Sequence, residues 1–104
     1  MRCRRCEPLP EEVRRAADLL ERRYSVSIIY ASHAGASRFN EFRQALGPIP
    51  PGTLAARLGE LEEAGLLERR VLDTRPPGVE YRLTERGLQL ESMLEALTRW
   101  ASAV

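Results

Sequence analysis

Lysine is absent from this sequence of 104 residues, in which all 16 basic residues are arginine. Against 15 acidic residues they leave a formal net charge of only +1, so no strong overall field attracts a polyanion. Contact with nucleic acid must therefore depend on where individual arginines lie. No apolar run approaches the ~20 residues of a membrane span, and no signal-peptide segment follows residues 1–6. We expect a cytoplasmic protein with no membrane partner.

Histidine and cysteine are also scarce, with one His and two Cys. A zinc site needs about four ligands, and a thioredoxin-type pair needs a βαβ frame that the sequence lacks. We therefore expect no metal and no cofactor. Cys3 and Cys6 lie among arginines, and neighbouring positive charge favours the reactive thiolate. They are either redox-sensing thiols or inert thiols of a basic tail.

An enzyme is not expected either. The sequence has no paired carboxylates on a shared buried face and no glycine-rich phosphate cradle after a strand. Its length suits one domain with one modest core. We expect residues 1–10 to be a flexible basic tail and residues 11–104 to be a single domain, because helical spacing begins directly after Pro10.

The spacing of apolar residues predicts a helix over about 11–23. The mostly apolar segment 24–34 is short enough for a strand or a buried helix, and its alanines favour the helix. Ser37 is placed to cap a third helix, in which Phe39, Phe42 and Leu46 share one face. A turn of prolines and glycines over residues 47–52 then leads into a helix over about 51–64. That helix carries Leu54, Leu58 and Leu61 at helical spacing.

The apolar period changes to two in residues 67–72 and 79–84, and the stretch between them contains two prolines and a glycine. This pattern predicts a β-hairpin. Thr84 is placed to cap a last helix over about 85–102. The fold class is mainly α with a small β-hairpin (α+β).

This order of elements matches a winged helix-turn-helix. In that plan the second helix of the unit, here about 47–64 with its turn, lies in the major groove of DNA. The hairpin, about 67–84, is the wing that reaches the neighbouring backbone. Helices at both ends of the chain then remain for dimerisation.

Three motifs sharpen this prediction: Arg38–Glu41 (RFNE), Leu58–Arg69 (LGELEEAGLLER) and Val79–Gly87 (VEYRLTERG). In this order and spacing they resemble the HxlR-type family of winged helix-turn-helix transcription regulators, of the MarR-like superfamily. The resemblance covers about residues 16–101. It implies a homodimer that binds pseudo-palindromic operator DNA, and it implies that Cys6 or Cys3 senses oxidants or electrophiles. The alternative is a winged-helix protein-interaction module that no longer binds DNA.

The sequence departs from the family pattern at three places. Arg22, Arg23 and Tyr24 stand where Gly-Lys-Trp is usual. Residues 49–52 (IPPG) replace an Ile-Ser start of the recognition helix, and Gly78 replaces an arginine of the wing. The last two departures remove polar groups that the family pattern places at DNA.

The start of the recognition helix supplies the first predicted DNA contacts, from Gly52, Thr53, Ala56 and Arg57. Arg57 can make a bidentate contact with guanine or with a phosphate, and Thr53 can bond a phosphate or pack on a thymine methyl group. The alternative for Arg57 is an ion pair with Glu60, three residues farther along the helix.

Two further points of the unit are predicted to contact DNA. Ser37 and Arg38 begin its first helix, where free N–H groups suit a phosphate; their alternative is a cap with a structural ion pair. Arg75 at the wing tip either reaches the DNA or is solvated.

Apolar side chains of the first and last helices predict a homodimer interface, because a single winged domain leaves part of the last helix uncovered. The predicted set is Val13, Ala17, Leu20, Leu90, Met93, Leu94, Leu97 and Trp100. No pattern identifies a small-molecule effector.

Overall fold

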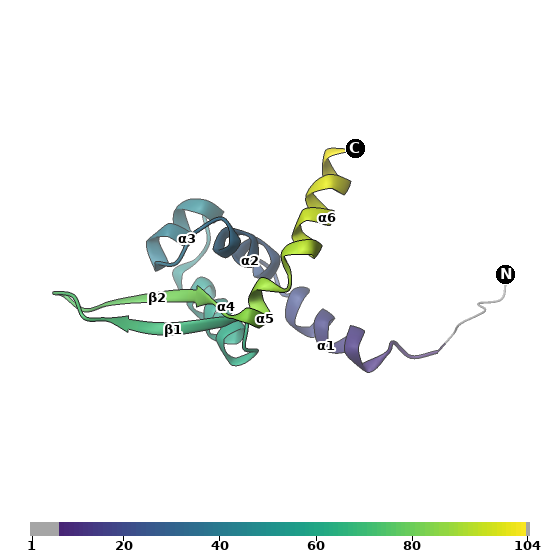
Figure 1. Cartoon of the computed structure of the whole chain (residues 1–104), viewed down its shortest axis with the longest axis horizontal. Coiled ribbons are helices and arrows are strands. Elements are labelled where there is room, and N and C mark those ends of the chain that lie inside the picture. Colours follow the sequence, from purple (N-terminus) through teal and green to yellow (C-terminus); the bar gives the residue numbers. More distant parts are fainter. Residues whose placement is uncertain (1–6, 104) are drawn as a thin grey trace.

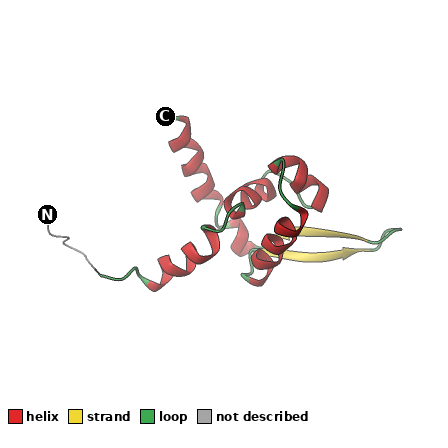
Figure 2. Ribbon diagram, turned by 180° about the vertical axis from the view of Figure 1, so that it is seen from behind, coloured by secondary structure: helices red, strands yellow, loops and turns green. Residues whose placement is uncertain are grey.

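A computed structural model of the chain describes residues 7–103 (Figures 1 and 2). Helices and one antiparallel hairpin follow in the order α1 (Glu11–Leu20), α2 (Ser25–His33), α3 (Phe39–Leu46), α4 (Pro51–Glu63), β1 (Leu67–Leu72), β2 (Gly78–Leu83), α5 (Glu85–Leu88) and α6 (Glu91–Ser102). The hairpin projects from one end of the molecule, and α1 and α6 lie toward the other end (Figure 1).

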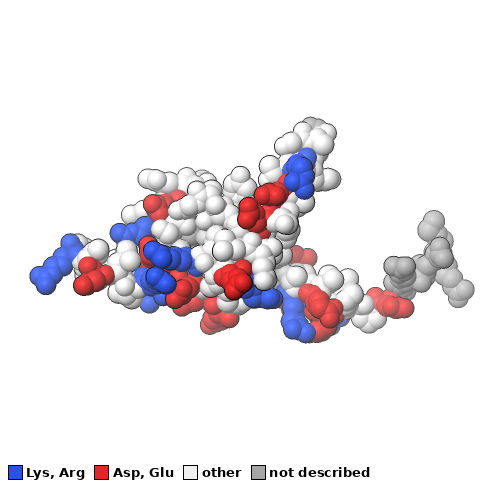
Figure 3. All heavy atoms as spheres, viewed as in Figure 1, with Lys and Arg blue, Asp and Glu red and all other residues white. Residues whose placement is uncertain are grey.

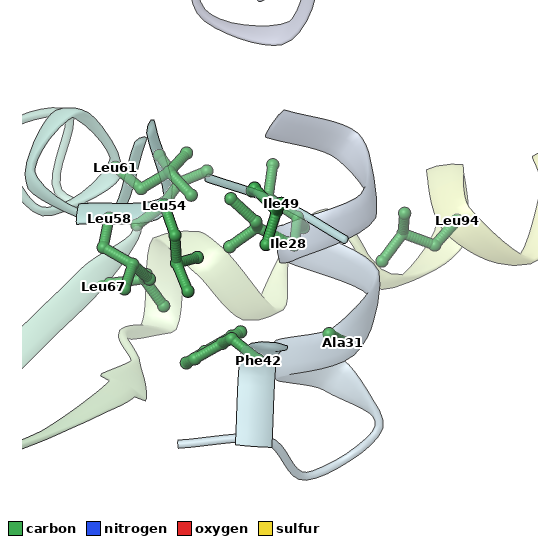
Figure 4. Close-up of a cluster of buried hydrophobic side chains, with 11 residues drawn as sticks. Ile28, Ala31, Phe42, Ile49, Leu54, Leu58, Leu61, Leu67 and Leu94 are labelled. Atoms are coloured by element: carbon green, nitrogen blue, oxygen red, sulfur yellow. The ribbon is translucent and has the colours of Figure 1, made fainter. Parts of the chain in front are cut away.

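The core is centred on the helix-turn-helix unit (Figure 4). Leu54, Leu58 and Leu61 of α4 are fully buried, together with Phe42 of α3 and Ile28 of α2. Each side chain of this size stabilises the fold by about 1.5–3 kcal/mol when it is withdrawn from water. The leucine spacing therefore fixes the rotation of α4 and leaves Ala55 and Ala56 exposed on its outer face.

The wing has the predicted strands, with a register that runs from Leu67 opposite Leu83 to Leu72 opposite Gly78. The segment before α3 lies along the free edge of β2. There the Tyr81 N–H donates to the Ser37 carbonyl at 2.8 Å. The first helix of the unit is thereby attached to the wing.

Two predicted helices differ in the structure. The helix expected over 11–23 ends at Leu20, because the turn that follows takes Tyr24 through a left-handed conformation with φ of +79°. The helix expected over 85–102 is two helices, α5 and α6. Thr84 caps only α5, and the Leu90 N–H closes a tighter turn onto the Gly87 carbonyl at 3.2 Å. Within residues 7–103 no helix is both long enough and apolar enough to span a bilayer.

Candidate nucleic-acid interface

The turn into α4 is fixed at its centre by a buried side chain. Ile49 is 4% exposed, and its N–H donates to the Gly47 carbonyl at 2.8 Å. Gly47 takes a φ of +79°, which glycine adopts at little cost. Pro50 and Pro51 follow at the N-cap and first helical positions, where the missing N–H of proline is not needed. The entry angle of the recognition helix is therefore rigidly defined.

The N-terminal end of α4 is open to solvent. Its first intrahelical bond runs from the Leu54 N–H to the Pro50 carbonyl at 3.0 Å, so the N–H groups of Gly52 and Thr53 have no partner within the helix. No side chain caps this end. Gly52 and Ala56 are exposed and Thr53 is partly buried. Free N–H groups at the positive end of a helix dipole suit a phosphate group.

Arg57 adopts its predicted alternative. Its Nη1 lies 3.2 Å from Glu60 Oε1, and its Nε–H donates to the Arg23 carbonyl at 3.0 Å. The ion pair with Glu60 is therefore confirmed. Contact of Arg57 with DNA stays a prediction, and it requires that these bonds be broken.

The prediction that Ser37 caps α3 is wrong, because Arg38 occupies the N-cap position. The Glu41 carboxylate instead accepts the backbone N–H groups of Ser37 and Arg38, both at 2.9 Å, as well as the Ser37 hydroxyl at 3.3 Å. The N–H of Ser37 first and that of Arg38 second hold the pKa of Glu41 below its ordinary value. This carboxylate takes the donors that were expected to face a phosphate, so a DNA contact of Ser37 stays a prediction.

Arg38 lies against the wing. A Cβ atom added to Gly78 would stand 2.5 Å from Arg38 Nη1, so the glycine provides the space that the guanidinium occupies. The departure from the family pattern at position 78 thus has a physical consequence. One arginine side chain fills the junction between the start of α3 and the start of β2, and Arg38 remains exposed there.

The hairpin neutralises most of its own charge. Arg70 lies 3.6 Å from Glu68, and Arg82 lies 2.7 Å from Glu80. Arg75 in the exposed turn has no such partner among the described residues. Figure 3 shows positive charge at the far tip of the wing. Arg69 of β1 is also exposed and has no ion pair with any of residues 7–103, so Arg75 at the tip and Arg69 are the arginines of the hairpin that can offer an unpaired positive charge to a phosphate.

The predicted dimer residues fall into two groups. Leu97 and Trp100 of α6 and Val13 of α1 are 44%, 72% and 49% exposed. Leu94 is only 5% exposed because it packs in the chain's own core, so it is not free for a partner. The remaining members of the set are partly buried: Ala17, Leu20, Leu90 and Met93.

Cys3 and Cys6 lie outside the described residues. Among residues 7–103 no group of His, Cys, Asp and Glu side chains is arranged to hold a metal ion.

Sequence reasoning missed the structural roles of two residues at this candidate site. Glu41 stands at the third position of α3, where a carboxylate commonly accepts the N–H groups before a helix, so the spacing from Arg38 could have identified it. The role of Gly78 had no local signal, because it depends on a side chain 40 residues earlier in the sequence.

Comparison with known proteins agrees with this geometry. Residues 19–104 match the family described as HxlR-like helix-turn-helix. The HTH-type transcriptional regulator YodB of Bacillus subtilis (strain 168) is 37% identical over 86 residues, which cover 83% of this chain and 77% of YodB. The regulator YvaP of the same organism is 34% identical over 88 residues, which cover 85% of this chain and 82% of YvaP.

Solved structures are similar over the same region. The redox regulator HypR in its oxidised form matches with a TM-score of 0.82 and 33% identity, covering 89% of this chain and 96% of HypR. The reduced form of YodB from B. subtilis matches with a TM-score of 0.78 and 34% identity, covering 90% of this chain and 92% of YodB. These relatives are transcription regulators and not enzymes. This chain, with its open recognition helix and its wing, belongs to the HxlR-like helix-turn-helix family of DNA-binding transcription regulators.

Proposed function

We propose that this protein is a homodimeric, sequence-specific regulator that binds a pseudo-palindromic operator. The observation that carries the proposal is the open N-terminal end of α4, with free N–H groups at Gly52 and Thr53 and no capping side chain. This end enters the major groove, whose width admits one α-helix. Thr53 and Ala56 meet the base edges, and Gly52 allows a close approach of the backbone to a phosphate.

The wing and the start of α3 hold the DNA backbone on either side. Arg38 at the junction with Gly78 and Arg75 at the wing tip bind phosphates, and Ser37 lies next to the first of these contacts. Such contacts position the protein on the duplex but carry no sequence information themselves. Sequence preference therefore comes from the few groups at the start of α4.

A second copy of the chain covers the exposed apolar residues of α1 and α6. Trp100, Leu97 and Val13 support this proposal, because each is a large apolar side chain left exposed to solvent, and exposed apolar surface favours association. A two-fold dimer presents two recognition helices, and its operator then contains two half-sites related by the same symmetry.

The regulator also responds to oxidants or electrophiles through Cys6 or Cys3. The support comes from the relatives, since HypR is described as a redox regulator and YodB has been solved in a reduced and a diamide-treated form. Both cysteines of this chain lie beside arginines, which favour the thiolate. Titration of DNA binding with diamide, for the wild type and for Cys6→Ser, tests this part. A response that Cys6→Ser leaves intact would move the role to Cys3, and no response in the wild type would remove it.

Fluorescence anisotropy with duplexes from the DNA flanking its own gene tests DNA binding. We expect saturable binding that weakens steeply with salt, because phosphate contacts release counterions. Sedimentation of the same sample should give the mass of two chains. Binding without salt dependence, or none on any flanking duplex, would favour a winged-helix module that binds another protein.

A further inference from the structure

The guanidinium of Arg57 is held within the protein at both of its sides. Its Nε–H donates to the Arg23 carbonyl at 3.0 Å, and Nη1 donates to Glu60 Oε1 and Oε2 at 3.2 and 3.4 Å. Only 19% of the side chain is exposed. Arg23 belongs to the turn between α1 and α2, so the Nε bond fixes the guanidinium to a different element from its own helix. Arg57 cannot reach the outer face of α4 without breaking these bonds.

Glu60 binds a second arginine from the same turn. Arg22 Nη1 donates to Glu60 Oε2 at 3.1 Å, while Arg57 Nη1 lies nearer to Oε1, at 3.2 Å, than to Oε2, at 3.4 Å. The carboxylate is 30% exposed and lies between two guanidinium groups, one on α4 and one on the turn after α1. Hydrogen bonds between oppositely charged groups are stronger than neutral ones. The charge of Glu60 is therefore the common element that holds both arginines.

We propose that Glu60 is a positioning residue that withholds Arg57 from DNA and fixes the recognition helix to the turn after α1. This inference rests on the proposed function, in which α4 enters the major groove. Arginine is the side chain that most often reads guanine, and it does so through a bidentate contact. With Arg57 withheld, the helix reads the base edges through Thr53 and the small side chain of Ala56, while its free N–H groups bind a phosphate and no guanidinium of α4 reads a base.

The charge-neutral variant Glu60→Gln tests the proposal. It keeps the shape of the side chain but removes the charge that holds Arg57 and Arg22. The matched control is Glu62→Gln, which removes the same charge from an exposed position of the same helix. Glu62 makes no ion pair with any of residues 7–103. The measured quantity is the slope of log affinity against log salt, for the duplex from the DNA flanking the gene that the wild type binds most tightly.

Each phosphate contact that is gained steepens this slope by about 0.9. We expect Glu60→Gln to steepen it by about that amount and to raise the affinity at low salt, while Glu62→Gln leaves the slope unchanged. The double variant Arg57→Ala with Glu60→Gln should return the slope to its wild-type value. Equal slopes for the two single variants overturn the proposal, and so does a steeper slope that survives the loss of Arg57.

A measurement without DNA separates this inference from the proposed function. In the free wild type, the Nε–H of Arg57 should exchange with water more slowly than that of exposed Arg14 by nuclear magnetic resonance. In Glu60→Gln the Nε–H keeps its bond to the Arg23 carbonyl but Nη1 loses its ion pair, so we expect this N–H to exchange faster than in the wild type. If the Nε–H groups of Arg57 and Arg14 exchange at the same rate in the wild type, Arg57 is not held by these bonds, whether or not the protein binds DNA. If the Nε–H is protected but the protein binds no DNA, the proposed function is refuted. The proposal that Glu60 withholds Arg57 from DNA then fails as well.

Discussion

Replacing Gly87 with alanine places a methyl group where the backbone leaves no room. The added Cβ would lie 2.3 Å from the Leu66 carbonyl oxygen and 2.9 Å from Leu83 Cδ2. The first of these atoms belongs to the main chain, so a change of rotamer cannot relieve the overlap. The same carbonyl accepts the Thr84 N–H at 3.1 Å, and the Gly87 carbonyl accepts His33 Nε2–H at 3.0 Å. Gly87 thus joins the end of the wing to α2 and to the turn after α4.

The expected cost follows from these contacts. Overpacking of a close-packed site costs typically 1–3 kcal/mol, and a lost backbone hydrogen bond adds about 1 kcal/mol. Alanine in place of glycine in a helix recovers about 1 kcal/mol. The net destabilisation is therefore about 2 kcal/mol, which lowers Tm by roughly 10 °C in a domain of this size.

Thermal unfolding followed by circular dichroism, at one protein concentration, measures this change. Gly59→Ala is the matched control, because it makes the same chemical change in α4 and its Cβ would meet nothing within 4 Å. We expect Gly59→Ala to raise stability by about 1 kcal/mol. If Gly87→Ala is as stable as the wild type, then α5 does not pack as closely against the Leu66 carbonyl as the structure indicates.

Three further outcomes are expected. Arg75→Ala should lower the DNA affinity on all duplexes and flatten the slope of log affinity against log salt by about 0.9, the value of one phosphate contact, whereas Arg14→Ala on α1 should do neither. Equal effects of the two variants would show that the wing tip does not contact DNA. Leu97→Glu should shift the sedimenting species from dimer toward monomer, while the control Val71→Glu in the wing should not. A dimer that persists in Leu97→Glu would show that the dimer interface lies elsewhere. Glu41→Gln should be less stable than the wild type at neutral pH. Because the folded pKa of Glu41 is lowered, its contribution is present above the pKa of the unfolded chain and is lost as the pH falls through the folded pKa. Urea unfolding at a series of pH values should therefore show the difference shrinking in acid, and a constant difference would contradict the carboxylate's role as acceptor.

Local patterns predicted the elements because each pattern repeats within one element. The leucines of α4 mark its buried face, and the alternation around Val79 and Tyr81 marks β2. The ends of elements were predicted less well. α1 stops at Leu20 because the next turn must bring α2 against the core, and no residue near Leu20 signals this.

The site was predicted in outline and changed in detail. The turn before α4 and the wing lie where the spacing of prolines, glycines and apolar residues places them. The partners of individual side chains could not be predicted, because they join distant parts of the chain. Arg57 pairs with the Arg23 carbonyl, and Arg38 fills the space left by Gly78.

The sequence by itself determined the order of the elements through the wing, the buried face of α4 and the family, since periodicity and short motifs are local properties of the chain. Tertiary structure alone decided which arginines are available. The charge of an arginine is a local fact, but whether its guanidinium faces DNA depends on the carboxylates and carbonyls that folding brings beside it. For Arg57 those groups are Glu60 and the Arg23 carbonyl, and they turn the side chain inward.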